Sequence, residues 1–113
     1  MNGTENFEAV ESRSELAAGA PKHSGEESFP PMLVHYRELK AQYPDCFLFY
    51  QVGDFYELFF DDARHVSRML NLTLTSRDKN NVNPVPMCSV PVAAVEGYLD
   101  RLVQAGCSVA IVS

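Results

Sequence analysis

The stretch CFLFYQVGDFYELF, at residues 46–59, decides the fold of this 113-residue chain. Its first half, residues 46–52, is an almost unbroken apolar and aromatic run, which is typical of a strand buried on both faces of a sheet. Gly53-Asp54 interrupts that run before a second one begins. Two such runs separated by Gly-Asp favour a β-hairpin, although a bulge within one continuing strand explains the same residues equally well.

The second half of the stretch places one carboxylate between aromatic rings. Side chains alternate between the two faces of an extended strand. One face is expected to carry Phe55, Glu57 and Phe59. The other face is expected to carry Tyr56, Leu58 and Phe60. A carboxylate between phenyl rings is costly to bury without a partner, so either that face opens to solvent or to a partner, or Glu57 finds hydrogen-bond donors. Both options indicate a functional site rather than ordinary core packing.

Helical patterns flank this stretch on both sides. Pro30-Pro31 precedes apolar residues at helical spacing that end before Pro44, which predicts the first helix. Asp61 and Asp62 predict the start of a second helix, because acids favour a helix N-terminus through capping and the macrodipole. The second helix is expected to end near Asn71.

The remaining patterns complete an α/β (α+β) fold. Further strands are expected at residues 72–75, 85–90 and 108–112. A third helix is expected over residues 92–104, stopped by Ala105-Gly106, and residues 77–84 are typical of an exposed loop. Helices alternating with apolar strands predict a mixed β-sheet flanked by helices, in a single small domain.

An acidic segment precedes that domain. Residues 1–28 carry six glutamates against Arg13 and Lys22, with Ser, Gly and Ala between them, which is typical of a disordered tail. We therefore divide the chain into a disordered acidic tail, residues 1–29, and a folded domain, residues 30–113. Because the chain stops directly after a predicted core strand, we expect it to be the N-terminal fragment of a longer protein.

Charge argues against an independent DNA-binding domain. The net charge is −6 and the sequence pI is about 4.9, with no cluster of Lys and Arg. A nucleic-acid role would therefore need phosphate contacts from other domains. The N-terminus lacks a secretory signal pattern, and no apolar run approaches the roughly 20 residues that span a bilayer. We expect a cytoplasmic protein with no membrane partner.

The reactive side chains give weak support for catalysis. Asp54, Glu57, Asp61 and Asp62 could hold a metal for phosphodiester cleavage. A sheet-borne nuclease site normally adds a Lys two residues beyond an acid on a neighbouring strand, and the only such pattern, Glu38-Leu39-Lys40, lies in a predicted helix. We assign no catalytic residue and no metal ligand.

Cysteine and histidine residues are equally poor candidates for catalysis. The three cysteines match neither a zinc pattern nor a disulfide framework, so we interpret them as small buried hydrophobes; they are Cys46, Cys88 and Cys107. Nothing in the sequence positions a histidine beside one of them; the histidines are His23, His35 and His65. A pure interaction module, with Phe55 and Phe59 in its core, remains open.

Recognition of a disturbed DNA duplex is the remaining interpretation. An apolar ring inserted between base steps kinks the duplex at a cost of a few kcal/mol per step, least where pairing is already weak. A carboxyl two residues further along the same strand face, at Glu57, could then hydrogen-bond a base edge. It would also repel nearby phosphates, so it would discriminate between sites rather than add affinity.

The motifs resemble a known family. GDFYELF at residues 53–59 is similar to the signature of the N-terminal mismatch-recognition domain (domain I) of the MutS DNA mismatch repair proteins. The resemblance extends over nearly the whole predicted domain. It also includes the following segments: Pro31-Met32 through Tyr36, Phe49 to Val52, Asp61-Asp62-Ala63, Leu74 to Arg77, and Pro86-Met87.

The resemblance implies roles for three residues. Phe55 would be the aromatic of the family's Phe-x-Glu motif, which stacks on a mispaired base, and Glu57 the acid that hydrogen-bonds that base. Arg77 matches a position near the DNA backbone. The implied partners are mismatched double-stranded DNA, the remaining domains of the same chain and, in the full-length protein, a second copy in a homodimer. ATP and Mg²⁺ would bind beyond Ser113, so this part is expected to need no cofactor and to be no enzyme by itself.

The sequence departs from the family at one loop. Residues 89–93 read SVPVA, where most relatives resemble Gly-[Ile/Val]-Pro-Tyr-His. Near the end, Ile111 is followed by Val112, where a Cys is common. These departures leave the Phe-x-Glu pair intact. They also permit an alternative, a diverged MutS-like paralogue in which the domain serves as a packing or interaction module without mismatch probing.

Overall fold

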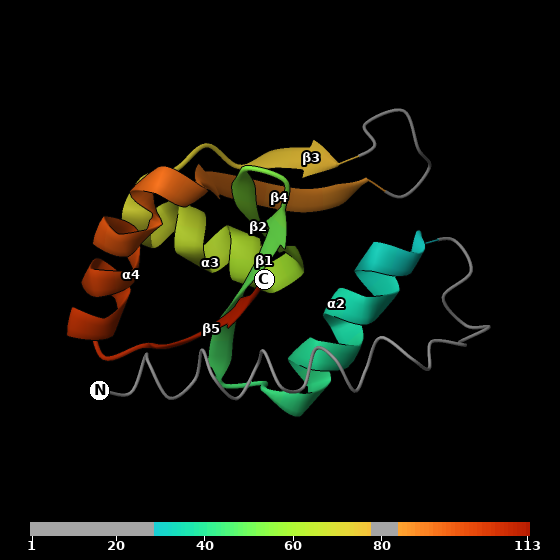
Figure 1. Ribbon diagram of the computed structural model, residues 1–113, viewed down its shortest axis with the longest axis horizontal. Helices are drawn as coiled ribbons and strands as arrows, with labels where there is room; N and C mark the ends of the chain where they lie inside the picture. The colour runs from blue at the N-terminus through green and yellow to red at the C-terminus, as the bar shows by residue number, and fades with distance from the viewer. Residues whose placement is uncertain (1–28, 78–83) are drawn as a thin grey trace.

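A five-stranded mixed sheet with helices on both faces forms the domain (Figure 1). The computed structural model describes residues 29–77 and 84–113. The elements in chain order are α2 (Pro31–Gln42), β1 (Cys46–Val52), β2 (Phe55–Phe59), α3 (Phe60–Leu70), β3 (Thr75–Arg77), β4 (Val85–Pro91), a 3₁₀ turn η2 (Val92–Ala94), α4 (Val95–Gln104) and β5 (Ser108–Val112). The predicted fold class is confirmed. Residues 1–28 of the predicted tail and residues 78–83 of the predicted loop lie outside the described residues.

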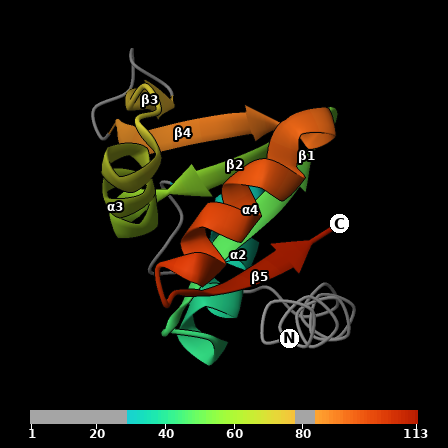
Figure 2. The ribbon, with the colours of Figure 1, turned by 90° about the vertical axis from the view of Figure 1, so that its left-hand side faces the viewer.

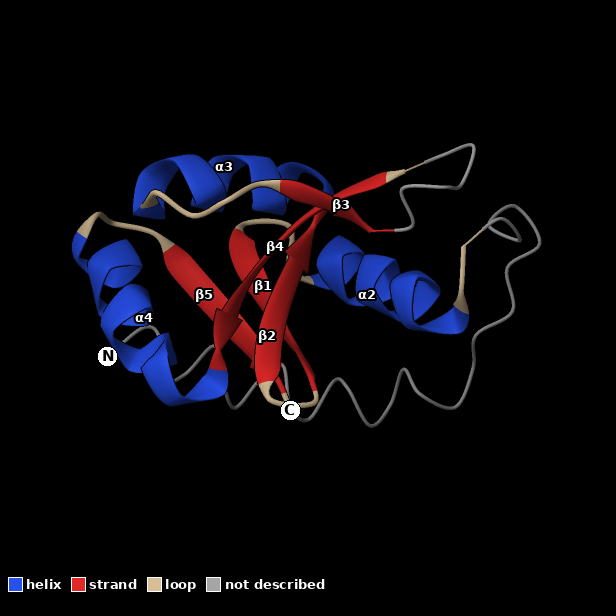
Figure 3. Ribbon diagram, turned by 90° about the horizontal axis from the view of Figure 1, so that it is seen from above, coloured by secondary structure: helices blue, strands red, loops and turns tan. Residues whose placement is uncertain are grey.

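The strands are ordered β3-β4-β2-β1-β5. β1 and β5 are parallel, and the other neighbouring strands are antiparallel. β1 and β2 form a hairpin in which Val52 lies opposite Phe55, so Gly53-Asp54 is a two-residue loop. Of the two alternatives that the sequence left open, the hairpin is therefore confirmed. Its turn lies at the end of β2 away from α3 (Figure 3).

Helices cover the two faces unequally, with α4 in front of the sheet and α2 behind it in Figure 2. Apolar residues of α3 and α4 pack with Tyr56 and Leu58 on one face. Leu33, Tyr36 and Leu39 of α2 pack with Phe59 on the other. We call these the α3/α4 face and the α2 face. Within the described part of the chain, no helix has the length and hydrophobicity to cross a bilayer.

Phe60 does not continue the strand alternation, and this expectation was wrong. The sequence placed it with Tyr56 and Leu58, but the Phe60 ring lies against Phe29 and Tyr36 on the α2 side. Its φ of 59° is the cause, because this left-handed conformation turns the chain from β2 directly into α3. A bulky residue in that region costs on the order of 1–2 kcal/mol. The surrounding contacts must therefore hold the junction in place.

Asp62 supplies the strongest of those contacts. α3 begins where predicted, but no side chain caps its N-terminus, so the capping role predicted for the two acids is wrong. The buried Asp62 carboxylate instead accepts the Leu48 backbone N–H at 2.9 Å and pairs with the Lys40 ammonium at 2.9 Å. Lys40 also donates to the Cys46 carbonyl at 2.6 Å. One carboxylate thus joins α2, β1 and α3.

The Tyr36 hydroxyl holds the adjoining end of β2. It accepts the Phe59 backbone N–H at 3.2 Å and lies 3.3 Å from the Phe59 carbonyl oxygen and 3.5 Å from the Asp62 carboxylate. Burial raises the pKa of this hydroxyl well above its usual value. A neutral hydroxyl therefore satisfies both backbone groups of Phe59 where β2 ends.

The strand predicted over residues 72–75 was also misplaced. The structure has β3 at Thr75–Arg77, while Leu72 extends the end of α3 by donating its N–H to the Ser67 carbonyl at 2.8 Å. Asn71 caps the helix in the left-handed conformation. The apolar alternation of residues 72–74 reflects packing of Leu72 on the α3/α4 face rather than strand pairing. The predictions for β4, α4 and β5 are confirmed, with residues 92–94 forming the 3₁₀ turn.

The cysteine interpretation holds for the two fully buried thiols. Cys46 and Cys88 are buried, and Cys107 is half-buried at the edge of the core. Burial raises the pKa of the Cys88 thiol to about 11 and also raises that of Cys46. Thiols that stay protonated at neutral pH are poor nucleophiles. Both therefore act as small core residues.

Replacing Asp62 with Asn should destabilise the domain far more than the same change at its neighbour. Asp62→Asn removes the ionic partner of Lys40 and one acceptor of a buried network, with an expected loss of about 1–3 kcal/mol. Asp61→Asn is the matched control, because Asp61 pairs only with Arg64 at an exposed site and should cost at most about 1 kcal/mol. Urea unfolding of both variants measures the difference, and equal losses would refute the anchoring role of Asp62.

Candidate nucleic-acid interface

The β1–β2 turn presents the predicted motif at an open end of the sheet. Gly53 has a φ of 63°, which suits the first loop position of a type II′ hairpin. Gln51 donates its side-chain amide to the Gly53 carbonyl at 3.1 Å, and the Val92 N–H donates to the Asp54 carbonyl at 2.8 Å. These two bonds tie the turn to β1 and to the end of β4. The turn is thus a fixed support for the residue that follows it.

Phe55 is that residue, and its side chain is exposed. It is 44% exposed although it lies within the sheet. Its direct cross-strand neighbours are Val52 on β1 and Pro91 on β4, and both are exposed as well. Three apolar side chains therefore stand in one row across three strands. The sequence motif indicated Phe55 alone, because only the strand register reveals the other two members.

Glu57 lies on the same α2 face as Phe55, one step deeper toward the core. It is half-buried between Tyr50 on β1 and Ser89 on β4. The Tyr50 hydroxyl is in turn hydrogen-bonded to the His35 ring nitrogen Nδ1 at 2.7 Å. Burial raises the pKa of the Glu57 carboxyl, while the positive charge of Arg77 partly opposes that rise. The carboxyl is therefore easier to protonate than an exposed one.

Arg77 shares this face, and its positive charge acts on the Glu57 carboxyl. It is the last residue of β3 and lies opposite Val85, whose side chain is buried on the α2 face. Directly paired residues point to the same side of a sheet. The structure thus brings the three predicted residues, Phe55, Glu57 and Arg77, to one face. Phe55 and Arg77 stand on opposite sides of Glu57.

The rest of the motif is structural. Tyr56 and Leu58 are buried on the α3/α4 face, and Phe59 is fully buried against Tyr36, with ring centroids 5.1 Å apart. The predicted division between the two faces is confirmed for these residues. Exposure falls steeply along the α2 face, from Phe55 through Glu57 to Phe59. The motif is therefore exposed at its tip, Phe55, and buried at its base, Phe59.

His35 borders this face through its hydrogen bond to Tyr50, whereas Asp61, Asp62 and His65 make their contacts elsewhere. Asp62 is engaged with Lys40, and Asp61 pairs with Arg64 on the exposed side of α3. His65 lies beside the ring of Phe47. Over residues 29–77 and 84–113, no three His, Cys, Asp or Glu side chains are grouped to hold a metal ion. The chemistry offered at the tip is therefore stacking, hydrogen bonding and a single cation.

Comparison with known proteins agrees with this geometry. The family model described as MutS domain I matches residues 30–113. The chain belongs to the MutS domain I family. It is 57% identical over 82 residues to a DNA mismatch repair protein MutS of Leuconostoc citreum, covering 73% of this chain and 10% of that protein. Corresponding proteins of Staphylococcus carnosus and Desulfovibrio desulfuricans are 51% and 56% identical over 81 residues, each covering 72% of this chain and 9% of theirs.

MutS domain I is a DNA-binding part of mismatch repair proteins, and residues 30–113 of this chain match its family model. The chain spans about a tenth of the length of the curated relatives that it matches. Within domain I, the residues resembling the family signature occupy the β1–β2 hairpin. The hairpin tip is therefore the candidate interface.

Neutralising Glu57 should stabilise the folded domain at neutral pH. A carboxyl whose folded pKa is raised above its ordinary value of 4.5 binds its proton more tightly in the folded state. Its stabilising contribution is complete below pH 4.5 and is lost as the pH rises through the folded pKa. Glu57→Gln should therefore raise the melting temperature at pH 7, with a gain that shrinks toward pH 4. Asp100→Asn, at an exposed acid of α4, controls for the loss of one negative charge. A gain independent of pH would contradict the assignment.

Proposed function

We propose that this domain reads mismatched double-stranded DNA through the tip of its β1–β2 hairpin. The single observation that carries the proposal is the exposure of Phe55, 44%, on a turn held by hydrogen bonds from Gln51 of β1 and from Val92, the first residue after β4. The relatives that match this chain are DNA mismatch repair proteins MutS, which supports the proposal. In this proposal, Phe55 inserts between base steps, Glu57 contacts a base edge and Arg77 contacts the backbone.

The energetics of an inserted ring explain how a mismatch would be selected. Unstacking a base step costs a few kcal/mol, and stacking on an aromatic side chain returns about 1–3 kcal/mol. The balance is near zero for matched duplex. It becomes favourable where pairing is already weak. Val52 and Pro91 extend the apolar surface on both sides of the Phe55 ring. An inserted ring would therefore keep little contact with water.

Glu57 and Arg77 would divide the polar contacts between them. A half-buried carboxyl with a raised pKa can accept a hydrogen bond from a base edge when ionised, or donate one when protonated. When ionised it repels phosphates, which Arg77 attracts. The pair therefore supports discrimination between sites more than affinity, and most phosphate contacts must come from elsewhere in the protein.

The proposal extends to the longer protein. We expect further domains of the same chain to hold the duplex and to carry an ATPase that uses ATP and Mg²⁺. We also expect a homodimer in the cytoplasm, in which one subunit's Phe55 probes the base steps. The domain itself would carry out no reaction. Alone it should bind DNA weakly, because residues 29–113 hold nine acids against seven bases.

That excess of acids also favours a second candidate function. A diverged paralogue could use the same fold as a packing module within its protein, without probing DNA. Residues 89–93, SVPVA, lie beside the hairpin, since Pro91 is the cross-strand neighbour of Phe55. A paralogue that no longer probes DNA would be expected to differ from the family at residues next to Phe55, and residues 89–93 do differ there.

Removing the Phe55 ring separates the two candidates. The test protein is the Leuconostoc citreum MutS in which residues 30–113 of this chain replace the matching segment. Phe55→Ala should reduce the ratio of affinities for a G·T mismatch and a matched duplex by roughly tenfold or more, because stacking worth about 1–3 kcal/mol is lost. Fluorescence anisotropy with both duplexes at one salt concentration measures that ratio.

Leu74→Ala is the matched control for Phe55→Ala. Leu74 is similarly exposed, at 46%, but lies in the segment that leads from α3 to β3. Its loss should leave the mismatch ratio unchanged. An unchanged ratio in Phe55→Ala as well would rule out probing and favour the packing module.

A further inference from the structure

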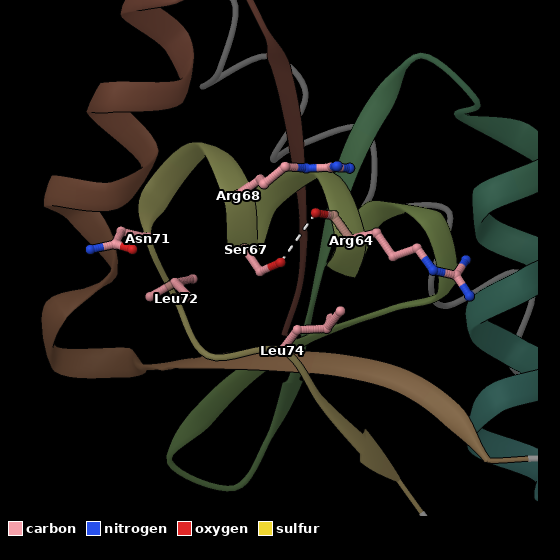
Figure 4. Close-up of a pocket in the computed structure, with 6 residues that line it drawn as sticks. All are labelled: Arg64, Ser67, Arg68, Asn71, Leu72 and Leu74. Carbon is pink, nitrogen blue, oxygen red and sulfur yellow. Dashed lines mark hydrogen bonds between the residues drawn. The ribbon is translucent and has the colours of Figure 1, made fainter.

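A groove lies on the far side of the sheet from Glu57. It runs between α3 and the segment leading into β3, and its lining residues are Arg64, Ser67, Arg68, Asn71, Leu72 and Leu74 (Figure 4). It continues over Thr75, Ser76, Pro84 and Pro86. In Figure 4 the long side chains of Arg64 and Arg68 extend toward the same side. The groove therefore has a basic wall and, at Leu74, an apolar one.

The charges of this groove are available to a partner. Among the residues that the structure describes, Arg64 forms an ion pair with Asp61, at 2.8 Å, and both side chains are mostly exposed. Arg68 is exposed and makes no ion pair with any residue in the part of the chain that the structure describes. Exposed ion pairs contribute little and exchange readily. Beside these arginines, Leu74 and Met69 are two of the four large apolar side chains that the domain exposes.

The sequence contains an acidic segment that is tethered near this groove. Residues 1–16 carry four glutamates, at positions 5, 8, 11 and 15, against Arg13, and they include Phe7 and Val10. The first described residue, Phe29, packs its ring against Phe60 at 5.8 Å, and Phe60 is the first residue of α3. The 28 preceding residues are therefore attached at the helix that forms the basic wall.

Distance permits the segment to reach the groove. Arg64 and Arg68 lie four and eight residues along α3 from Phe60, which is about 6 and 12 Å at the helical rise. Because Phe29 and Phe60 pack on the α2 side, the segment must also pass around the helix, which is about 10–12 Å across. An extended chain covers about 3.3 Å per residue, so the twelve residues between position 16 and Phe29 span about 40 Å, which exceeds this path. Tethering also holds the segment at an effective concentration on the order of 1 mM, so weak contacts are enough to populate a docked state.

We propose that the acidic N-terminal segment, residues 1–16, docks in the groove of α3. Its glutamates pair with Arg64 and Arg68, and its apolar side chains cover Leu74. The contact is reversible and weakens with salt, because it depends on exposed charges. It occupies the α3 side of the sheet and leaves the tip at Phe55 and Glu57 open. The proposal does not depend on the DNA-reading role.

Backbone amide NMR of the intact 113-residue chain tests this docking. The unmodified chain is compared with a variant carrying Glu5→Gln, Glu8→Gln, Glu11→Gln and Glu15→Gln. Amide shift differences should concentrate at residues of the groove, above all at Ser67, Arg68, Asn71 and Leu74. They should fade at about 0.5 M salt, where the screening length falls to a few ångström.

Substitutions in the groove make the test specific. In a background of Arg64→Gln and Arg68→Gln, the shift differences caused by the four glutamine substitutions should disappear. In a background of Arg101→Gln, an exposed arginine of α4, they should persist. Differences that are absent at the groove, centred on another surface or unaffected by the arginine substitutions would overturn the proposal.

Discussion

The buried end of β2 depends on one hydroxyl group. Tyr36 of α2 binds both backbone groups of Phe59 where β2 leaves the sheet and the chain turns through the left-handed Phe60 into α3. The Asp62 carboxylate completes the contact by accepting the Leu48 N–H and pairing with Lys40. Unpaired backbone groups at this depth would each cost about 1–3 kcal/mol. These contacts make the abrupt junction between strand and helix possible.

The same junction positions the candidate interface. β2 is only five residues long, so fixing Phe59 at its base fixes the direction in which Phe55 leaves the sheet. The fall in exposure from Phe55 to Phe59 separates an exposed tip from a fully buried base. Glu57 lies at the boundary, and its raised pKa is the electrostatic consequence of that position.

Much of this arrangement could be predicted from the sequence, and the failures have physical causes. Local patterns predicted the helices and the faces of β2 from Phe55 to Phe59, because each depends on residues near in sequence. They left a hairpin and a bulge open at Gly53-Asp54, and the strand register decides for the hairpin. The direction of Phe60 was predicted wrongly, because a positive φ at a non-glycine residue is set by tertiary contacts. Capping by Asp62 was also predicted wrongly, because its carboxylate binds the backbone of another strand instead. Val52 and Pro91 were missed as neighbours of Phe55, because only the register brings them together. Placing Arg77 on the same face as Glu57 required the strand order of the sheet, and assigning Arg77 a role required the family resemblance.

Amide hydrogen exchange of the intact chain tests the central claim, that buried side-chain acceptors hold the base of β2 while its tip stays open. The Phe59 and Leu48 amides are bonded to Tyr36 and Asp62 rather than to a neighbouring strand. If these contacts are as strong as we conclude, both amides will exchange only through global unfolding, as slowly as the most protected amides of β1. Exchange of either amide through local opening, well before global unfolding, would contradict the account.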